Sequence, residues 1–557
     1  MRKFLIFVAA TLISGALFAG GIVTNTNQSA AWVRLPSRNA STEIDAVYYN
    51  PAGLMKLKNG FHFSVSNQSI EQNKTIKNFY KSPGTQFGLN QPEYDGKVTA
   101  PLFPSIYAVY KTDRLAYSLG FGPVGGGGGA VFKKGLPSFE MSAADLVPAL
   151  QPTTGADAYK LDAYFEGTSV FLGFQGGVSF KVNDMISIGA GLRYVSAKNT
   201  YKGHLNNIQL ELPTGWQNAN DIMNGIAAQV TSITTIPAEL APALPALGTL
   251  NLATAAGFSP TLAAAKPSIE AALASMGIPS ATIAAMSLNA ISATVTAATP
   301  SLLASAAKYS ATATLLGNQS ADVAQTGSGI APIFSVNISP SENLNIAIKY
   351  EGITKMTLKN KTKQDFTTGY NTAGAPITMF PDGAVTPNDM PAMLTLGVEY
   401  KVSPAFKLSV GGNYFFDKSA NYGHTMDLDN NSATPPTFVK NSYIIDDNGY
   451  SIDGGLEYKI NDKCLISCGY IYANQGVNNN FQSDIDYFQG SQTFGLGGAY
   501  NVKENIQINI GVSYTYYMNT QNYVSHVYAG TPAEVYRPLQ TYAKNAMLVG
   551  IGVDFSF

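Results

Sequence analysis

Large apolar residues alternate with small or polar ones along many stretches of this chain. In residues 506–516 the isoleucines, Val512 and the tyrosines occupy even positions, and small or polar residues occupy odd ones. The last stretch, 547–557, alternates in the same way and ends on Phe557. Successive side chains of a strand point to opposite faces, so a period of two predicts β-strands and not helices.

Tight polar turns separate these strands and alternate with long irregular segments. The short turns fall in 110–117, 180–187, 338–345, 400–407, 458–465 and 500–507, and the long segments in 126–165, 203–327, 360–390, 420–447, 476–490 and 521–541. Short turns at one end and long loops at the other are typical of outer-membrane barrels. With a first strand near 61–74 and a last near 543–557, the six turns join fourteen strands. We therefore predict an all-β fold in which residues 61–557 form a 14-stranded antiparallel transmembrane barrel, closed by pairing of the last strand with the first.

The N-terminal residues and the composition agree with export to the outer membrane. Arg2 and Lys3 precede a short apolar run and small residues, which predicts a signal peptide at 1–19, cleaved after Ala19. Only 13% of the 557 residues are charged, against about a quarter in soluble domains. The formal net charge of −1 leaves no electrostatic footprint for nucleic acid. An even strand count predicts that both termini are periplasmic.

Residues 20–60 lack the strand pattern and end in "STEIDAVYYNPAGLMKL". Pro51 fixes its own φ and disfavours helix at Asn50, whose side chain can bond its own backbone in a turn. These residues, with Ala52 and Gly53, are expected to end the segment and direct the chain into strand one.

This motif resembles the N-terminal hatch of the FadL-type long-chain fatty acid transporters of the outer membrane. The resemblance continues through three strand pairs, at 168–198, 394–416 and 494–516. It implies that residues 20–60 form a hatch that plugs a 14-stranded barrel, and that the protein imports hydrophobic molecules, foremost long-chain fatty acids, without a cofactor. Family hatches often have a Gly-rich stretch where this chain has "WVRLPSRNA", so the packing of the plug is expected to differ.

A glycine-rich run, "GPVGGGGGAVFKKG", continues the third predicted strand. It lacks the lysine and hydroxyl residue of a phosphate-binding loop. Glycine weakens strands and marks bends, and in the resembling family the third strand has an inward kink that opens the wall sideways. We expect such a kink at Gly122, Pro123, Gly125 and Gly126. A flexible loop is the alternative.

The long segment at about 203–327 contains an Ala-, Ser- and Thr-rich region, 222–307. Its uncharged run from Ala271 to Ala307 is long enough for a membrane helix, but its residues drive insertion weakly and Pro279 and Pro300 interrupt it. We expect an extended extracellular loop with helices, which acts as a lid or as an apolar capture surface.

A fatty acid requires an apolar lumen and a few cationic donors for its carboxylate. Strand alternation turns Arg193, Lys349, Glu351 and His62 toward the lumen. Arg193, Lys349 and His62 are therefore candidate ligand-binding residues. An internal salt-bridge ladder that braces the barrel is an equally good interpretation, above all for Lys349 with Glu351.

Two other function classes compete with transport by lateral release through the strand-three kink. A lipid hydrolase would need His62 as its base and a luminal serine, but no catalytic motif supports one. A general porin would need an open, charged lumen. We expect no enzyme activity and no metal site, and Cys464 and Cys468 are too far apart along one strand, roughly 13 Å, to pair with each other. The expected partners are a hydrophobic ligand (fatty acid or hydrocarbon), outer-membrane lipid and the β-barrel assembly machinery, with the protein a monomer.

Overall fold

The computed structural model describes residues 24–371, 373–426, 428, 434–528 and 535–557. The signal peptide expected at 1–19 lies outside the described residues.

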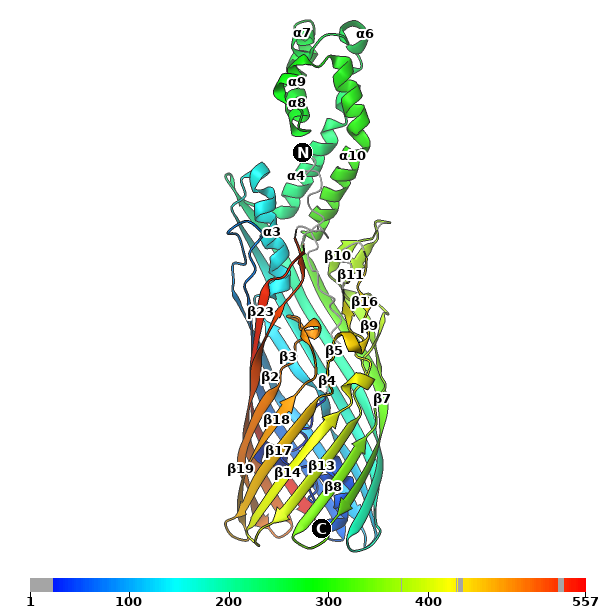
Figure 1. Ribbon diagram of the computed structural model, residues 1–557, viewed down its shortest axis with the longest axis vertical. Helices are drawn as coiled ribbons and strands as arrows, with labels where there is room; N and C mark the ends of the chain where they lie inside the picture. The colour runs from blue at the N-terminus through cyan, green and yellow to red at the C-terminus, as the bar shows by residue number, and fades with distance from the viewer. Residues whose placement is uncertain (1–23, 372, 427, 429–433, 529–534) are drawn as a thin grey trace.

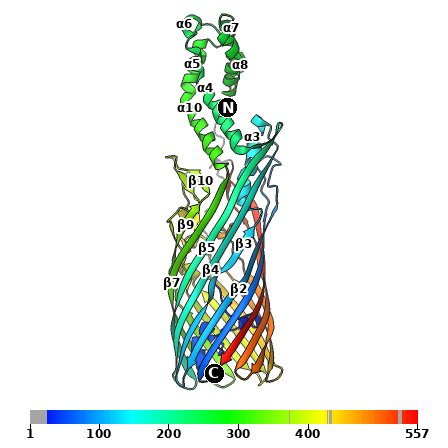
Figure 2. The same ribbon diagram turned by 180° about the vertical axis from the view of Figure 1, so that it is seen from behind.

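A closed antiparallel barrel forms most of the molecule (Figures 1 and 2). Its sheet contains seventeen strands, of which β6, β9 and β12 are extensions at one end, and the other fourteen form the wall. The wall strands are β1 (Gly60–Asn78), β2 (Glu93–Lys111), β3 (Leu115–Phe132), β4 (Ala158–Lys181), β5 (Ile186–Leu212), β7 (Gln319–Ile338), β8 (Leu344–Glu351), β13 (Met393–Lys401), β14 (Phe406–Phe415), β17 (Tyr450–Lys459), β18 (Cys464–Asn474), β19 (Ser491–Lys503), β20 (Ile506–Tyr523) and β23 (Leu539–Ser556). The predicted fold class is confirmed.

Pairing of the last strand with the first closes the barrel. β1 and β23 pair from His62 with Ser556 to Asn78 with Gln540. The backbone N–H of Phe557 donates to the carbonyl oxygen of Phe61 at 2.7 Å, so the closure extends to the last residue. No strand edge is therefore left open at this seam.

The wall is much taller on one side than on the other. β5 has 27 residues, whereas β14 has 10, and about 9–11 residues are enough for a strand to cross a bilayer. Strands β4, β5 and β7 extend far beyond this length, into segments for which the sequence predicts loops. The C-terminus lies at the short-turn end, opposite the tall loops (Figure 1).

The outward side chains form an apolar belt. Leu119, Leu192 and Leu496 are 67%, 59% and 65% exposed, which is the alternation expected of strands that face acyl chains. Exposed tyrosines lie on the wall toward both ends of the belt: Tyr110, Tyr117, Tyr400, Tyr458 and Tyr500 near the short turns, and Tyr350, Tyr414, Tyr450, Tyr514 and Tyr516 toward the long loops. Both cysteines of β18 are free.

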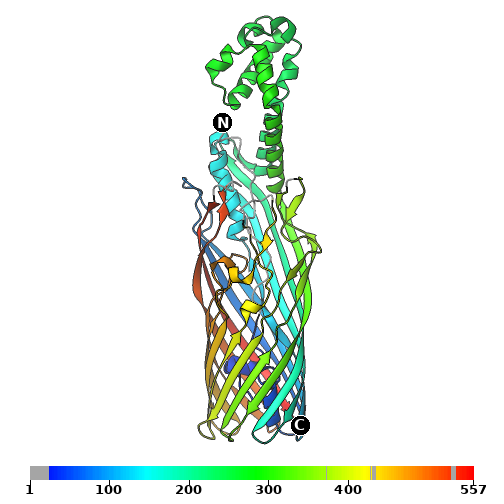
Figure 3. The same ribbon diagram turned by 45° about the vertical axis from the view of Figure 1, so that its right-hand side comes forward.

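A short helical segment fills the half of the barrel nearest the short turns (Figure 3). It comprises α1 (Ala30–Arg34), α2 (Ala46–Tyr49) and the 3₁₀ helix η1 (Pro51–Lys56). We refer to residues 24–57 as the hatch. Inward-facing glycines form its bed: a Cβ on Gly511 would lie 2.5 Å from the nitrogen of Arg34, and one on Gly397 would lie 2.5 Å from the nitrogen of Ala40. Close approach of the two backbones therefore requires glycine on the wall.

Helices cover and extend the long-loop end. α3 (Pro137–Thr154) packs against β4 and β5 in the mouth of the barrel. A helical projection rises above it (Figure 1) and comprises α4 (Ala219–Ile233), α5 (Ile236–Leu240), α6 (Leu244–Leu247), α7 (Leu252–Ala256), α8 (Pro260–Ser275), α9 (Ser280–Ala285) and α10 (Leu288–Leu315). By length and composition α10 qualifies as a membrane span, but here it packs along α4 and α5.

Small elements complete the loops at this end. They are β6 (Gly215–Asn218), β9 (Thr357–Gln364), β10 (Thr367–Tyr370), β11 (Pro376–Thr378), β12 (Val385–Pro387), η2 (Asp417–Ser419), β15 (Thr425–Met426), β16 (Thr437–Phe438), η3 (Asn441–Tyr443), η4 (Asn479–Phe481), β21 (His526–Val527) and β22 (Val535–Tyr536). β8 and β9 both pair with β7. β9 therefore continues the line of β8 after an interruption between Glu351 and Thr357.

Candidate functional site

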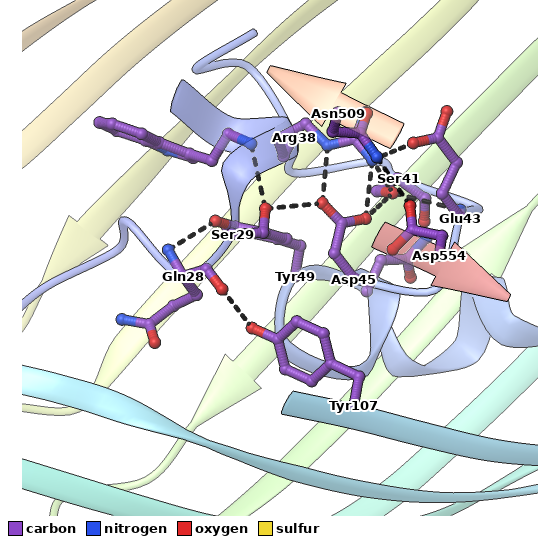
Figure 4. A network of polar contacts seen from close by, with 12 residues as sticks. Gln28, Ser29, Arg38, Ser41, Glu43, Asp45, Tyr49, Tyr107, Asn509 and Asp554 are labelled. Atoms are coloured by element: carbon purple, nitrogen blue, oxygen red, sulfur yellow. Dashed lines mark hydrogen bonds and ion pairs between the residues drawn. The ribbon is translucent and has the colours of Figure 1, made fainter. Parts of the chain in front are cut away.

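A buried ion-pair network holds the hatch in one conformation (Figure 4). Arg38 donates to both carboxylate oxygens of Asp45, at 2.9 and 2.7 Å, and to Glu43 at 2.6 Å. Ser29 and Ser41 donate to the same Asp45 carboxylate. Such bidentate, charge-assisted bonds are strong and directional. They cross-link the hatch internally, in addition to its contacts with the wall.

Charged residues also join the hatch to the wall. Arg34 donates to Asn509 at 3.0 Å, Glu457 at 2.6 Å and Ser467 at 2.9 Å, on three different strands. Burial alone would raise the pKa of Glu43, but the positive charges of Arg38, Lys407 and Arg34 outweigh it and hold this pKa well below its usual value. Glu43 is therefore ionised at neutral pH and contributes to the network as an anion.

The Asn50–Gly53 motif fixes the end of the hatch against the wall. The Asn50 side chain donates to Asn337 at 2.7 Å, and the backbone of Ala52 accepts from Ser187 at 2.7 Å. A Cβ on Gly53 would lie 2.7 Å from the carbonyl oxygen of Ser41, so only glycine fits there. The motif thus ends the hatch and turns the chain toward β1.

The wall has a gap in its hydrogen bonding between β2 and β3. Regular pairing stops after Lys97 on β2 and resumes at Ile106. Pro101 and Pro104 lie between these points, and proline has no N–H to donate to a ladder. Leu102, in the same stretch, is 77% exposed, more than any other large apolar side chain in the part of the chain that the structure describes.

The glycine run of β3 faces this gap. The register of β3 with β4 shifts between Pro123 and Gly125, and again before Gly128. Gly126 has a φ of +84°, and a Cβ there would collide with the carbonyl oxygen of Ser169. Glycine is therefore required at this bulge. The irregularity lies at the residues for which the sequence predicts a kink: Gly122, Pro123, Gly125 and Gly126.

The start of the hatch bonds directly to the irregular part of β3. The backbone N–H of Asn25 donates to the carbonyl oxygen of Val124 at 3.0 Å, and the Gln28 side chain donates to the carbonyl oxygen of Pro123 at 2.7 Å. Both carbonyl oxygens accept from residues inside the barrel. The hatch therefore satisfies backbone groups that an ordinary neighbouring strand would have satisfied.

An apolar groove of about 900 Å³ lies on the outer surface of β1 to β5. Its floor is made of small residues, including Gly176 and Ala190, and its sides include the exposed Phe63, Leu119 and Leu192. It lies on the short-turn side of the gap, because Ala108 and Leu119, which line it, pair where the β2–β3 ladder has resumed.

Arg193 and Lys349 lie inside the barrel, 1% and 2% exposed, and both contact the hatch. Arg193 donates to Glu351 and to Gln175 (2.7 and 3.1 Å). Lys349 donates to the carbonyl oxygen of Tyr48 at 3.0 Å and lies 3.6 Å from Glu351. Both cations lie 4.6 Å from the centroid of the Tyr48 ring. This geometry favours the bracing interpretation, and a ligand role for these residues stays a prediction.

His62 lies at the barrel seam. One ring nitrogen is 2.9 Å from the Ser556 hydroxyl and the other is 2.8 Å from the carbonyl oxygen of Lys58. Both polar ring atoms are thus used where β1 meets the end of β23. A ligand role for His62 also stays a prediction.

Above the hatch, the lumen contains the largest apolar cluster of the molecule, and α3 closes it. Glu140 of α3 accepts hydrogen bonds from Tyr94 and Tyr159. Asp145 of α3 accepts from Ser82 at 2.9 Å and is 2.7 Å from the His526 ring. The apolar side chains of this cluster include Phe139 of α3 and, from other segments, Val98, Phe132, Phe165, Tyr201, Phe366 and Phe380. This apolar cluster lies on the same side of the hatch as the gap, where it offers apolar contacts to a ligand.

Sequence reasoning did not single out the hatch arginines. Arg34 and Arg38 are both fully buried and hold the plug in place. A signal was present, because two arginines at 34 and 38 and two acidic residues at 43 and 45, in a largely apolar segment, need partners inside the fold. Strand alternation did not reveal them because the hatch has no regular period.

Comparisons with known proteins agree with this architecture. The family model described as "Outer membrane protein transport protein (OMPP1/FadL/TodX)" matches residues 251–557, more than half of the chain. A comparison with curated proteins gives no match. Among solved structures, a FadL homologue of Pseudomonas aeruginosa is similar, with 13% identity, a TM-score of 0.56, and coverage of 96% of this chain and 99% of that chain.

Two toluene transporters are similar at lower TM-scores. TodX of P. putida has 14% identity and a TM-score of 0.47, covering 92% of this chain and 94% of that one. TbuX of Ralstonia pickettii has 14% identity and a TM-score of 0.44, covering 95% and 99%. Because the family model matches more than half of the chain, and the fold agrees with it, the chain belongs to the OMPP1/FadL/TodX family of outer-membrane transport proteins.

Proposed function

We propose that this protein imports long-chain fatty acids and releases them sideways into the outer membrane through the gap between β2 and β3. The family and the fold are those of an outer-membrane transporter of hydrophobic compounds. The fatty acid as ligand and the lateral route are the parts that we add. The long-loop end with its helical projection would face outside, and both termini would face the periplasm.

The gap in the β2–β3 ladder is the observation that carries this proposal. An interrupted ladder leaves backbone groups of β2 and β3 without strand partners in the wall, and the hatch bonds two of these groups, the carbonyl oxygens of Pro123 and Val124, from the lumen. The groove on the outer face of β1 to β5 begins where pairing resumes. An apolar chain that leaves the gap would be received there among apolar side chains and lipid.

The hatch argues against an axial aqueous pore. Arg34 by itself bonds the hatch to three strands, β17, β18 and β20. Ala52, near the end of the hatch, bonds it to β5 and β7. A general porin needs an open, polar lumen. We also propose that the protein is a transporter and not an enzyme, because His62, the base that a hydrolase would need, is bonded into the barrel seam.

Uptake of labelled lauric acid by cells that express the protein tests this function. We expect uptake well above that of cells without the protein, together with a low ion conductance of the purified protein in planar bilayers. Uptake at background level would contradict the transport function. A large, steady conductance would instead favour a porin.

A further inference from the structure

Three inward-facing residues form a row across neighbouring strands in the upper lumen. Lys74 on β1 pairs with Lys544 on β23, and Lys544 pairs with Tyr517 on β20. All three belong to the inward set of their strands. Two lysines thus lie directly opposite each other inside the barrel.

This juxtaposition lacks an adequate counter-charge. Like charges directly opposite each other on adjacent strands destabilise a sheet. Among the described residues, neither ammonium group has a hydrogen bond or an ion pair within 4.0 Å. Asp486, in the loop above, is the nearby acid; burial raises its pKa to about 6, although both lysines oppose this shift. One carboxyl group therefore faces two lysines, and it does not match their combined charge when both are protonated.

Aromatic rings and an unpaired hydroxyl complete the surroundings. The Lys544 ammonium lies 3.9 Å from the centroid of Tyr517, and 5.9 Å from that of Tyr487. The Lys74 ammonium lies 5.6 Å from the Tyr487 centroid. Tyr487 is only 5% exposed, yet its hydroxyl has no hydrogen-bond partner in the part of the chain that the structure describes. A buried hydroxyl without a partner is costly, and the ring that carries it has both ammonium nitrogens within 6 Å of its centroid.

The same row leads to the lateral gap. Across β1 and β2, Lys74 pairs with Gly96, and across β2 and β3, Gly96 pairs with Phe132. The next residue of β2, Lys97, is the last one paired before the ladder opens. The two lysines therefore lie at the level of the long-loop end of the gap, Lys74 one strand away from it on β1 and Lys544 two strands away on β23.

We propose that Lys74 and Lys544, with the Tyr487 hydroxyl, bind the carboxylate of an alkyl carboxylic acid whose chain extends toward the gap. Bound there, the carboxylate is attracted by the positive charge. It accepts hydrogen bonds from the Lys74 and Lys544 ammonium groups and from the Tyr487 hydroxyl. The aromatic rings hold the first methylene groups. This inference rests on the proposed function and deepens it, because it distinguishes carboxylic acids from neutral hydrocarbons.

Binding of lauric acid and of lauryl alcohol to the purified protein in a neutral detergent tests this site. The two probes share one chain and differ in charge. In the double variant Lys74→Met with Lys544→Met, we expect lauric acid to bind about 10- to 100-fold more weakly and lauryl alcohol to bind as in the wild type. Loss of the like-charge repulsion should leave the heat-modifiable barrel intact. Lys77→Met is the matched control, because Lys77 lies on the same strand but is half exposed and paired with Glu93 at 3.0 Å.

A second variant tests the sign of the charge effect. Asp486→Asn removes the anion that competes with the ligand, so we expect it to tighten lauric acid binding several-fold and to leave the alcohol unchanged. Unchanged lauric acid affinity in the double lysine variant, with normal binding by the wild type, would overturn the site and leave the transport function standing. A wild-type protein that binds neither probe would overturn both.

Discussion

Arg34 of the hatch donates to Glu457 of β17 at 2.6 Å, a buried ion pair between residues 423 positions apart in the chain. The Arg34 side chain is fully buried and that of Glu457 is 12% exposed. A buried charge pair therefore joins the hatch to the wall. Separating the two residues would leave an uncompensated buried charge on each side, which costs free energy.

Replacing Arg34 should loosen the hatch. Removal of one partner of a buried pair typically costs about 3–5 kcal/mol, and Arg34→Met also deprives Asn509 and Ser467 of their donor. We expect a barrel that still assembles but that conducts ions measurably in planar bilayers. The control is Lys77→Met, on the outer face of β1. If Arg34→Met conducts no more than this control, the hatch does not depend on the pair.

The Arg193–Glu351 pair should behave as a brace between wall and hatch. Arg193→Met leaves the Glu351 carboxylate with only Lys349, at 3.6 Å, so we expect the barrel to unfold at a lower temperature. Adding Glu351→Gln should restore part of that loss, because the uncompensated charge is then gone. Lauric acid and lauryl alcohol should bind to Arg193→Met with equal changes. A selective loss of lauric acid binding would instead show that Arg193 binds the ligand carboxylate.

Acid should weaken the loop packing around His424. His424 is 8% exposed and stacks on Phe481, with ring centroids 5.2 Å apart. Burial lowers the pKa of His424 to about 4, below the unfolded value of about 6.5. A depressed folded pKa means that this contribution is fully present above pH 6.5 and is lost as the pH falls toward 4.

At pH 5 the expected loss is about 2 kcal/mol relative to pH 7.5. Limited proteolysis of the loop at 420–445 should therefore be faster at pH 5 in the wild type. In His424→Phe, which keeps an aromatic ring but cannot titrate, the rate should not change with pH. Equal rates in the wild type at both pH values would exclude His424 as the titrating group.

Topology can be tested from both ends of the barrel. An epitope tag after Phe557 should be inaccessible to antibodies in intact cells, whereas a tag in the exposed turn at Phe258 of the helical projection, 71% exposed, should be accessible. The reverse labelling pattern would place the helices in the periplasm and contradict the direction of import.

The alternation of apolar and polar residues was sufficient to predict the strands of the barrel wall. It was not sufficient to predict the hatch and the contacts inside the lumen. The pattern at 506–516 gave the core of β20, and the polar turns gave the strand count, because a lipid-facing strand leaves a regular signal. The upper parts of β4, β5 and β7 were expected to be loops, since outside the bilayer both faces of a strand may be polar. The partners of Arg34, Arg193 and Lys74 depend on contacts across the lumen that no local period records.

The central claim is that ligand leaves through the β2–β3 gap, and site-specific obstruction of the gap tests it most directly. In a background with Cys464 and Cys468 replaced by serine, Leu102→Cys places a thiol at the gap, and Leu496→Cys places one on the outer face of β19, away from the gap and the groove. Uptake of labelled lauric acid is measured before and after reaction with a bulky maleimide. We expect modification at residue 102 to reduce uptake to background and modification at residue 496 to leave it nearly unchanged. Full uptake with residue 102 modified would contradict lateral release through this gap.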